Sequence, residues 1–344
     1  MAEPGKASAG FVLALAGCML SATLAAQNST ALDFYGSLRT QLERVGPDRR
    51  DSFGAYTSVR DAYSRLGVKL DYPLDSGLAL VGQLEIPLDS AHARLRDPYD
   101  QEEPIRIARI GLRGRFGSMV YGQQWMPYYN AIAAPVDRFS SYYSGYATYT
   151  VFRVARTIAY ASPELEGLSF AAAYSGSRGN RRSTSRIDAR RWQATASYTR
   201  GNTRIGAGID DRGDAGYGGN RLYGLSATHQ ADKLYLALKY ELFDTGNLQP
   251  GGFSSKGNRA INLFGSYVLG KGTLKLMLAK VENYGDRIVH LGIDYTLSDQ
   301  YKLFAEYYRE AETAALSPSR GGLADFDASI RGGHALALGL RYDF

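Results

Sequence analysis

Apolar and polar residues alternate along most of the chain from residue 32 onward. The last segment illustrates the pattern, because Leu336, Leu338, Leu340, Tyr342 and Phe344 alternate with Ala337, Gly339, Arg341 and Asp343. Segments 64–72, 233–242 and 289–297 repeat it. A period of two is typical of β-strands that have one apolar and one polar face. The chain is therefore predicted to be all-β.

The pattern yields about sixteen strand-like segments, most of them nine to thirteen residues long. We expect them near 32–43, 62–74, 78–87, 105–115, 118–124, 153–162, 168–176, 191–200, 202–210, 220–229, 233–242, 258–269, 272–281, 287–297, 299–309 and 333–344. Around 105–116 the alternation of apolar and polar residues is interrupted, because four arginines occupy both faces of the segment. A β-bulge is expected there.

The connections between these segments alternate in length. Seven are short turns, such as those at 75–77 and 270–271, whereas eight are long and polar, such as 44–61 and 125–152. This alternation indicates an up-and-down antiparallel barrel with tight turns at one rim and loops at the other. Both ends of the barrel domain, residues 27–344, then lie on the tight-turn side.

A barrel of sixteen strands is too wide for side chains to fill, so its lumen holds water. The apolar face must then point outward to lipid, and strand closure satisfies every backbone polar group in the bilayer. Tyr and Phe near the ends of the apolar faces suit an interfacial girdle: Phe34, Tyr72, Tyr198, Tyr267, Tyr295, Tyr301, Tyr342 and Phe344. The alternative is a secreted sandwich with aromatic-rich strands, which would need two packed sheets.

Residues 1–26 resemble an export signal. Lys6 supplies a weak positive charge, residues 11–20 an apolar run, and residues 23–26 a small-residue cleavage region. Cleavage is expected after Ala25 or Ala26. The segment ending in Cys18 also fits a lipoprotein signal, so lipidation at Cys18 stays an open alternative. Cleavage at Ala25 or Ala26 would leave no cysteine in the mature chain, which then needs no disulfide.

Charge and histidine content point away from several other functions. The net charge of +6 is mild, and the basic residues alternate with apolar ones instead of forming a stripe, which disfavours nucleic-acid binding. The four histidines are scattered, and no His/Cys cluster has metal-ligand spacing. We expect no cofactor, no metal and no catalysis. An outer-membrane barrel hydrolase remains the enzyme alternative, although the only pairing suggested is His290 with Asp294 on one face.

Several short stretches, in order and at suitable intervals, resemble the general trimeric porins of Gram-negative outer membranes. They are Leu32-Asp33-Phe34-Tyr35-Gly36, Ser64-Arg65-Leu66-Gly67-Val68-Lys69, Val120-Tyr121-Gly122-Gln123-Gln124, Gly167-Leu168-Ser169-Phe170-Ala171 and the terminal Leu340-Arg341-Tyr342-Asp343-Phe344. The resemblance covers nearly the whole mature chain at low identity. It implies a homotrimer in the outer membrane, in contact with lipid and lipopolysaccharide. It also implies that the assembly machinery reads the C-terminal Phe344.

The resemblance further implies a third loop that folds into the lumen and narrows it. Basic residues on the wall would face acidic residues on that loop. By position, Arg65, Arg106 and Arg153 match the wall arginines and Asp137 the loop acid, and Lys69 shares the inward face of Arg65. Such fixed charges favour small polar solutes over apolar ones. The plain alternative is that these arginines only solvate a wet wall.

Two departures and two alternatives qualify this expectation. Gln123 stands where the family often has an arginine, which puts a subunit-bridging ion pair in doubt, and Arg138 dilutes the charge of Asp137. The third loop is rich in aromatic residues that could form a sugar-stacking track in a substrate-selective porin for sugars or anions: Trp125, Tyr128, Tyr129, Tyr142, Tyr143, Tyr146 and Tyr149. An arginine cluster in a predicted outward loop either binds anions or lipopolysaccharide or is merely solvated: Arg181, Arg182, Arg186, Arg190 and Arg191.

Overall fold

The computed structural model describes most of the predicted barrel domain. The described residues are 32–48, 54–74, 77–96, 105–145, 147–176, 190–213, 219–252, 254–311 and 332–344. The predicted export signal with Cys18, together with Tyr146 and the arginines at 181, 182 and 186, lies outside them. Among the described residues, no helix is both long enough and apolar enough to cross a bilayer.

The described residues form seventeen strands joined in one sheet. They are β1 (Leu32–Pro47), β2 (Tyr56–Asp61), β3 (Arg65–Pro73), β4 (Ala79–Pro87), β5 (Ile107–Gly114), β6 (Gly117–Trp125), β7 (Arg153–Ala161), β8 (Leu168–Ser175), β9 (Arg191–Arg200), β10 (Thr203–Asp211), β11 (Asn220–Ala231), β12 (Leu234–Thr245), β13 (Arg259–Leu269), β14 (Gly272–Val281), β15 (Gly285–Thr296), β16 (Tyr301–Glu310) and β17 (Gly333–Asp343). Every strand pair is antiparallel. A short π-helical turn, η2 (Tyr129–Ala133), lies between β6 and β7.

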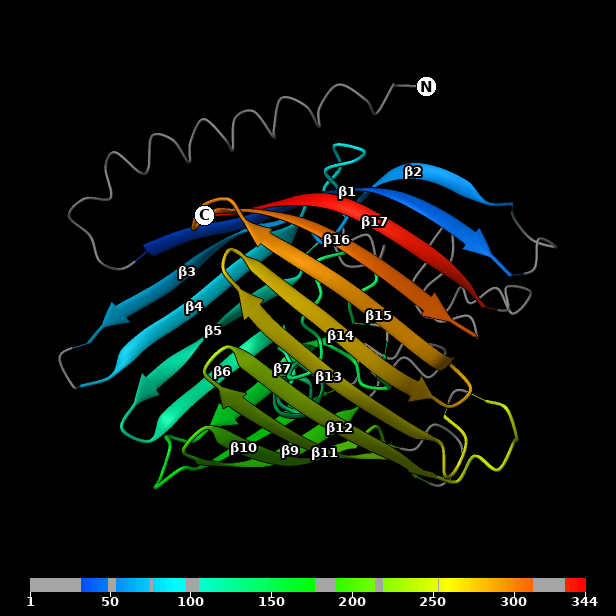
Figure 1. The fold of residues 1–344 in the computed structure, drawn as a ribbon. Coiled ribbons are helices and arrows are strands. Elements are labelled where there is room, and N and C mark those ends of the chain that lie inside the picture. Colours follow the sequence, from blue (N-terminus) through cyan, green and yellow to red (C-terminus); the bar gives the residue numbers. More distant parts are fainter. Residues whose placement is uncertain are drawn as a thin grey trace, which may run out of the picture.

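The sheet closes into a barrel because β1 pairs with β17 on one side and with both β2 and β3 on the other (Figure 1). β2 and β3 are two halves of one barrel strand, interrupted at Ala62–Ser64, where Tyr63 has a φ of 69°. The barrel therefore has sixteen strands around its circumference, as predicted. A closed single sheet also excludes the sandwich alternative.

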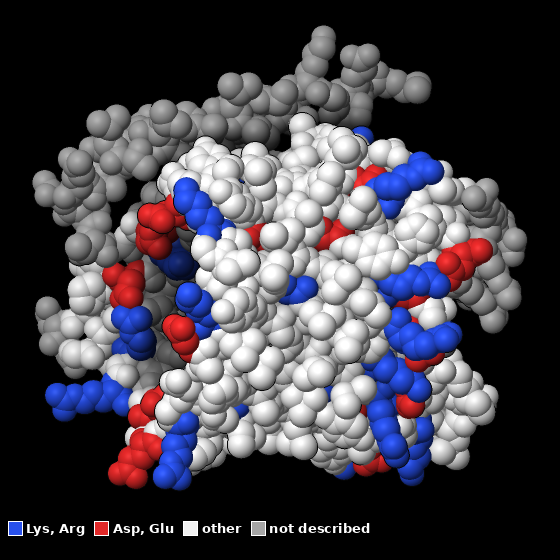
Figure 2. All heavy atoms as spheres, in the orientation of Figure 1, with Lys and Arg blue, Asp and Glu red and all other residues white. Residues whose placement is uncertain are grey.

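The two faces of the wall have the burial predicted for a membrane barrel. In β17, Leu336, Leu338 and Leu340 are 43–51% exposed, whereas Ala335 and Ala337 on the other face are buried. Inward-facing polar residues elsewhere, such as Lys239 and Glu306, are almost fully buried. Figure 2 shows a broad, mostly uncharged band of outer surface between two rims where charged side chains gather. Apolar surface thus faces the bilayer, and charge is confined to the rims and the interior.

Three predictions about local structure are wrong. Most of the predicted connection 44–61 is strand, because β1 runs to Pro47 and β2 begins at Tyr56. The register of β5 with both neighbours is regular over its length, so the irregularity predicted at 105–116 is not there. Arg191 opens β9 and its side chain is buried, so it does not belong to an outward loop.

The irregular register instead lies between β6 and β7, at Gly122 to Gln124. Gly122 has a φ of +136°, and a Cβ at this position would lie 2.0 Å from the carbonyl oxygen of Ala108 on β5. Only glycine fits there. The bulge lets both Gln124 and Arg153 turn inward at the point where the chain leaves the wall for the third loop.

Candidate pore constriction

The segment between β6 and β7, residues 126–152, packs against inward-facing side chains of the wall. It leaves a cavity of about 360 Å³ beside the opposite wall. The cavity is lined by Tyr35, Arg39, Tyr63, Arg65, Gln83, Glu85, Arg106, Ile107, Trp125, Tyr129, Asp137, Arg138, Phe139, Ser144, Gly145, Phe152, Arg153 and Arg341. Among the residues that the structure describes, six arginines and two carboxylates therefore line this cavity.

Four of the five predicted constriction residues meet in this cavity: Arg65, Arg106, Arg153 and Asp137. Lys69 does not line it. Lys69 lies four residues from Arg65 toward the short-turn rim, where about half of its side chain is exposed and its Nζ lies 3.7 Å from Asp33. Because each strand residue advances about 3.3 Å, four residues place Lys69 about 13 Å along the strand from Arg65, outside this cavity.

The wall arginines surround one buried acid, Glu85. Arg106 Nε donates to Glu85 Oε1 at 2.8 Å, and Arg65 Nε lies 3.6 Å from Glu85 Oε2. The hydroxyl of Tyr35 donates to the same carboxylate at 2.9 Å. These contacts satisfy the carboxylate and fix both guanidinium groups. Among the described residues, one negative charge is thus shared by two positive charges.

Two more arginines come from the seam where the barrel closes. Arg39 on β1 and Arg341 on β17 are cross-strand partners, so two like charges stand side by side on the inner face. Arg39 Nε donates to Ser37 Oγ at 2.7 Å, and Arg341 Nε donates to Asp343 at 2.6 Å. Asp343 offsets part of this charge, but only Arg39 and Arg341 reach the cavity.

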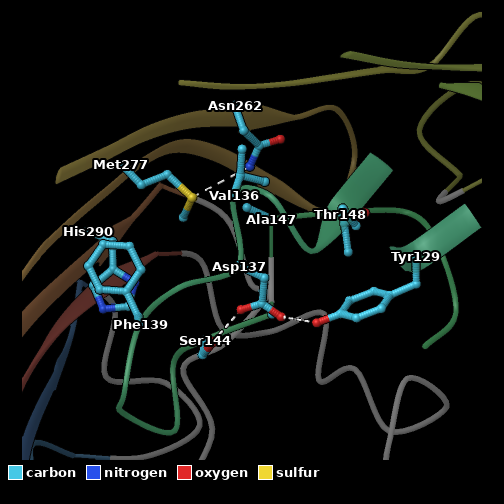
Figure 3. Close-up of a pocket in the computed structure, with 12 residues that line it drawn as sticks. Tyr129, Val136, Asp137, Phe139, Ser144, Ala147, Thr148, Asn262, Met277 and His290 are labelled. Carbon is cyan, nitrogen blue, oxygen red and sulfur yellow. Dashed lines mark hydrogen bonds between the residues drawn. The ribbon is translucent and has the colours of Figure 1, made fainter. Parts of the chain in front are cut away.

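On the loop side, Asp137 is held by neighbours from the same loop (Figure 3). The hydroxyl of Tyr129 donates to Asp137 Oδ2 at 2.7 Å, and the hydroxyl of Ser144 donates to Oδ1. Burial and the neighbouring Asp137 carboxylate raise the pKa of Tyr129 well above its ordinary value, so the phenol stays protonated and keeps donating. Arg138 turns toward Tyr235 on β12, with its guanidinium carbon 4.0 Å from the ring centroid.

Most of the aromatic residues of the loop do not face the channel. Tyr128, Tyr142, Tyr143 and Tyr149 are at most 2% exposed and pack between the loop and the wall. Trp125 and Tyr129 do line the cavity and stack at 4.6 Å between ring centroids. The guanidinium of Arg153 lies 5.0 Å from the Trp125 ring centroid. Of the described residues of the aromatic track suggested by the sequence, only Trp125 and Tyr129 line the cavity.

Buried charges on the wall hold the loop at several places, which include single hydrogen bonds from Tyr143 to Glu43 and from Arg212 to the carbonyl of Tyr149, and two larger clusters. In the first cluster, Lys239 Nζ donates to the carbonyl of Ala147 at 2.8 Å and contacts Glu241 at 2.6 Å. Glu241 in turn accepts bonds from the hydroxyl of Thr148 and the backbone N–H of Tyr149, at 3.0 Å each. The pair satisfies loop backbone groups that would otherwise be buried without partners.

The second cluster lies around Glu306 on β16. Its carboxylate accepts the backbone N–H groups of Ser140 at 2.7 Å and Ser141 at 3.1 Å, and it contacts Lys275 at 3.0 Å and His290 at 3.0 Å. His290 therefore pairs with Glu306. The predicted neighbour Asp294 instead contacts Lys275 at 2.8 Å. Glu306 thus holds the loop backbone at Ser140 and Ser141, and Asp294 accepts a hydrogen bond from the Ser140 hydroxyl.

A small cavity of about 20 Å³ separates the loop from the wall behind Asp137 (Figure 3). Phe139 closes one side by stacking on His290, and Asn262 and Met277 of the wall form another. Asn262 Oδ1 and His290 Nδ1 have no hydrogen-bond partner among the described residues. The space is about that of one water molecule.

Several residues that line the cavity are not predicted from the sequence: Arg39, Glu85, Phe152 and Arg341. Glu85, Arg39 and Arg341 all occupy the polar face of a correctly predicted strand. The signal that places Arg39 beside Arg341 is closure of the barrel between the first and last strands.

The sequence matches a family model described as Gram-negative porin over residues 9–315. It is 26% identical over 262 residues to a monosaccharide porin of a Halomonas species, covering 67% of this chain and 69% of that protein. It is 27% identical over 244 residues to the outer membrane protein YedS of Escherichia coli, covering 66% of each.

Solved structures share the fold. An anion-selective porin from Comamonas acidovorans superposes with a TM-score of 0.71 at 15% identity, over 91% of this chain and 99% of that chain. OmpF of Salmonella typhi in complex with daunomycin gives a TM-score of 0.68 at 16% identity, over 91% and 97%.

Proposed function

The chain belongs to the Gram-negative porin family, and from this premise we propose that its channel prefers anions and that arginines of the constriction set this preference. The family and the closed barrel make it an outer-membrane porin, a water-filled channel for passive diffusion of small hydrophilic solutes. Both also point to a channel rather than an enzyme. The residues of the constriction further support a preference for anions over cations.

The single observation that carries the proposal is the charge of the constriction. Six arginines line it with two carboxylates, and each carboxylate is already engaged: Glu85 by Arg65 and Arg106, and Asp137 by Tyr129 and Ser144. A net positive potential in a narrow lumen raises the local concentration of anions and opposes cations. The proposal rests on these side chains, because the likeness to the anion-selective porin is a likeness of fold alone.

The proposal is tested by the reversal potential of single channels in a KCl gradient. Arg65→Gln and Arg153→Gln should each reduce the preference for chloride, because each removes one positive charge from the cavity lining. Lys69→Gln is the matched control. It removes the same charge from the same wall but outside the cavity, so its reversal potential should stay close to that of the wild type. Unchanged potentials in both arginine variants would remove them from the site.

A sugar-selective porin is the second candidate. The observation that favours it is the stacked pair Trp125 and Tyr129, which lines the constriction and offers an apolar face to a sugar ring. Liposome swelling with sugars and amino acids of graded size separates the two. Saturable uptake of one solute class would favour a selective porin, whereas rates that fall smoothly with size indicate a general sieve.

We also propose a homotrimer and recognition of Phe344 during assembly. Support for the latter is that Phe344 sits at the seam, where its backbone exchanges hydrogen bonds with Gly36 at 2.9 and 3.1 Å. Contact of the outer rim with lipopolysaccharide remains a proposal of the same kind. Closure of single channels in three equal steps would indicate three lumens, and a Phe344 deletion should lower the amount of folded porin in the outer membrane.

A further inference from the structure

The lumen contains a second chamber on the short-turn side of the third loop. Its volume is about 290 Å³. Trp125, Pro127, Asn130 and Ala131 at the start of the loop form its roof, and inward-facing residues of β5 to β10 form its walls down to the turn at Ser162. Short turns of such barrels face the periplasm. The chamber therefore lies between the constriction and the periplasmic mouth.

The chemistry of this chamber differs from that of the constriction. Its described lining contains two arginines, Arg109 and Arg204, and no aspartate or glutamate. Most of the other polar groups of the lining are hydroxyls and amides, among them those of Ser118, Gln124, Asn130, Ser169, Thr195 and Ser197. Such a lining offers cationic hydrogen-bond donors together with groups that both donate and accept.

Neither arginine is neutralised among the residues that the structure describes. On β5, Arg106 pairs with Glu85 at 2.8 Å and Arg113 with Asp71 at 2.7 Å, but Arg109 between them forms no ion pair. The cross-strand neighbours of Arg109 are Gln83 and Gly122, so neither carries a charge.

Arg204 on β10 is in a similar position. Its Nη2 donates to the hydroxyl of Ser197 at 2.9 Å, and its cross-strand neighbours are Thr199 and Thr228. No described carboxylate forms an ion pair with it. Two guanidinium groups with free donors thus line one chamber from strands on different parts of the wall.

We infer that this chamber is a separate, weak binding site for small hydroxylated organic anions of the size of a sugar acid. Guanidinium groups bind carboxylates through paired hydrogen bonds, and the hydroxyl-rich wall recognises the hydroxyls of the same solute. The volume is close to the lower end of small-molecule pockets, about 300 Å³. The inference rests on the proposed function, because an anion-preferring constriction is what delivers such solutes to the chamber.

The test uses gluconate to block the chloride current of single channels, with addition from each side in turn. Wild-type protein should show saturable block at a lower concentration than with butyrate, which has the charge without hydroxyls, or glucose, which has hydroxyls without charge. The double variant Arg109→Gln/Arg204→Gln should need about tenfold more gluconate for half-block, since it removes both charged donors of the chamber.

Arg113→Gln is the matched control, because Arg113 lies on the same strand and inner face but outside the chamber. It should leave half-block unchanged. If the double variant does not insert, each single variant should still raise the half-block concentration about threefold. Equal half-block in wild type and variants, or equal block by gluconate and butyrate, would overturn the inference.

The measurements distinguish a failure of this inference from a failure of the proposed function. Loss of the constriction arginine in Arg65→Gln should change the reversal potential but leave half-block nearly as in the wild type when gluconate is added from the short-turn side, because that side reaches the chamber without crossing the constriction. A wild-type channel without anion preference would contradict the proposed function, whatever the block data show. An anion-preferring channel whose block ignores Arg109 and Arg204 would contradict only the second site.

Discussion

The phenyl ring of Phe139 lies flat on the imidazole of His290, with 3.5 Å between ring centroids and 6° between ring planes. Phe139 belongs to the third loop and His290 to β15, so this contact joins the constriction to the wall. The same histidine is held by Glu306, which also accepts the backbone N–H groups of Ser140 and Ser141. Stacking on His290 and hydrogen bonds to Glu306 thus hold residues 139–141 of the third loop against the wall.

Phe139→Ala should loosen the loop without opening the barrel. Removing the ring leaves the small cavity behind Asp137 larger and deprives His290 of its stacking partner. We expect a higher mean conductance and more current noise than in the wild type, measured by single-channel recording.

The control for this change is Tyr267→Ala, which removes an aromatic ring from the outer face of β13, where the side chain is 44% exposed. Its conductance should match that of the wild type. A Phe139→Ala channel with wild-type conductance and noise would mean that the hydrogen bonds alone fix the loop.

Lys239→Met should strongly destabilise the folded protein. Lys239 and Glu241 are both fully buried, and removing one partner leaves an uncompensated charge, which costs about 3–5 kcal/mol. The double variant Lys239→Met/Glu241→Gln should lose less, because no charge remains. Urea unfolding of detergent-folded protein measures both. The exposed Lys233→Met provides the control, and a single variant no less stable than the double one would contradict this explanation.

The predicted architecture follows from local pattern, and its success has a physical reason. Lipid on one side and water on the other impose a period of two on each strand, which a sequence displays directly. β2 was missed because Tyr56–Asp61 alternates polar residues with Thr57 and Val59, which gives no apolar face. A strand that extends beyond the bilayer does not need one.

The residues of the candidate constriction were predicted less completely, because the height of a side chain in the lumen depends on distant parts of the chain. Arg65 and Lys69 share one strand and one face, yet only Arg65 reaches the cavity. Strand tilt and the path of the loop decide which inward residues lie at the same height, and neither is encoded in the alternation. Arg39 and Arg341 are neighbours only because the barrel closes.

Asp137→Asn should increase the preference for anions while conductance stays similar. The amide oxygen can still accept a hydrogen bond from Tyr129 or Ser144, so the loop keeps much of its support, but one of the two negative charges of the cavity is lost. Reversal potentials measure the change. Ser144→Ala keeps the charge and removes one hydrogen bond, so an equal shift in that variant would assign the effect to loop structure.

The anion preference should weaken as salt rises. The screening length falls from about 10 Å at 0.1 M to about 3 Å at 1 M, so fixed charges act over less of the lumen. Reversal potentials at a constant tenfold KCl ratio, taken at low and high mean concentration, test this. A preference that does not change with salt would indicate selection by size or by direct binding instead of by the field of the arginines.

The most direct test of the central claim is the zero-current potential of single wild-type channels in a KCl gradient across a planar bilayer. Six arginines against two engaged carboxylates predict that chloride crosses faster than potassium, so the potential takes the sign set by chloride. A potential of zero, or one of the sign set by potassium, would contradict the claim that the arginine-lined constriction governs what passes.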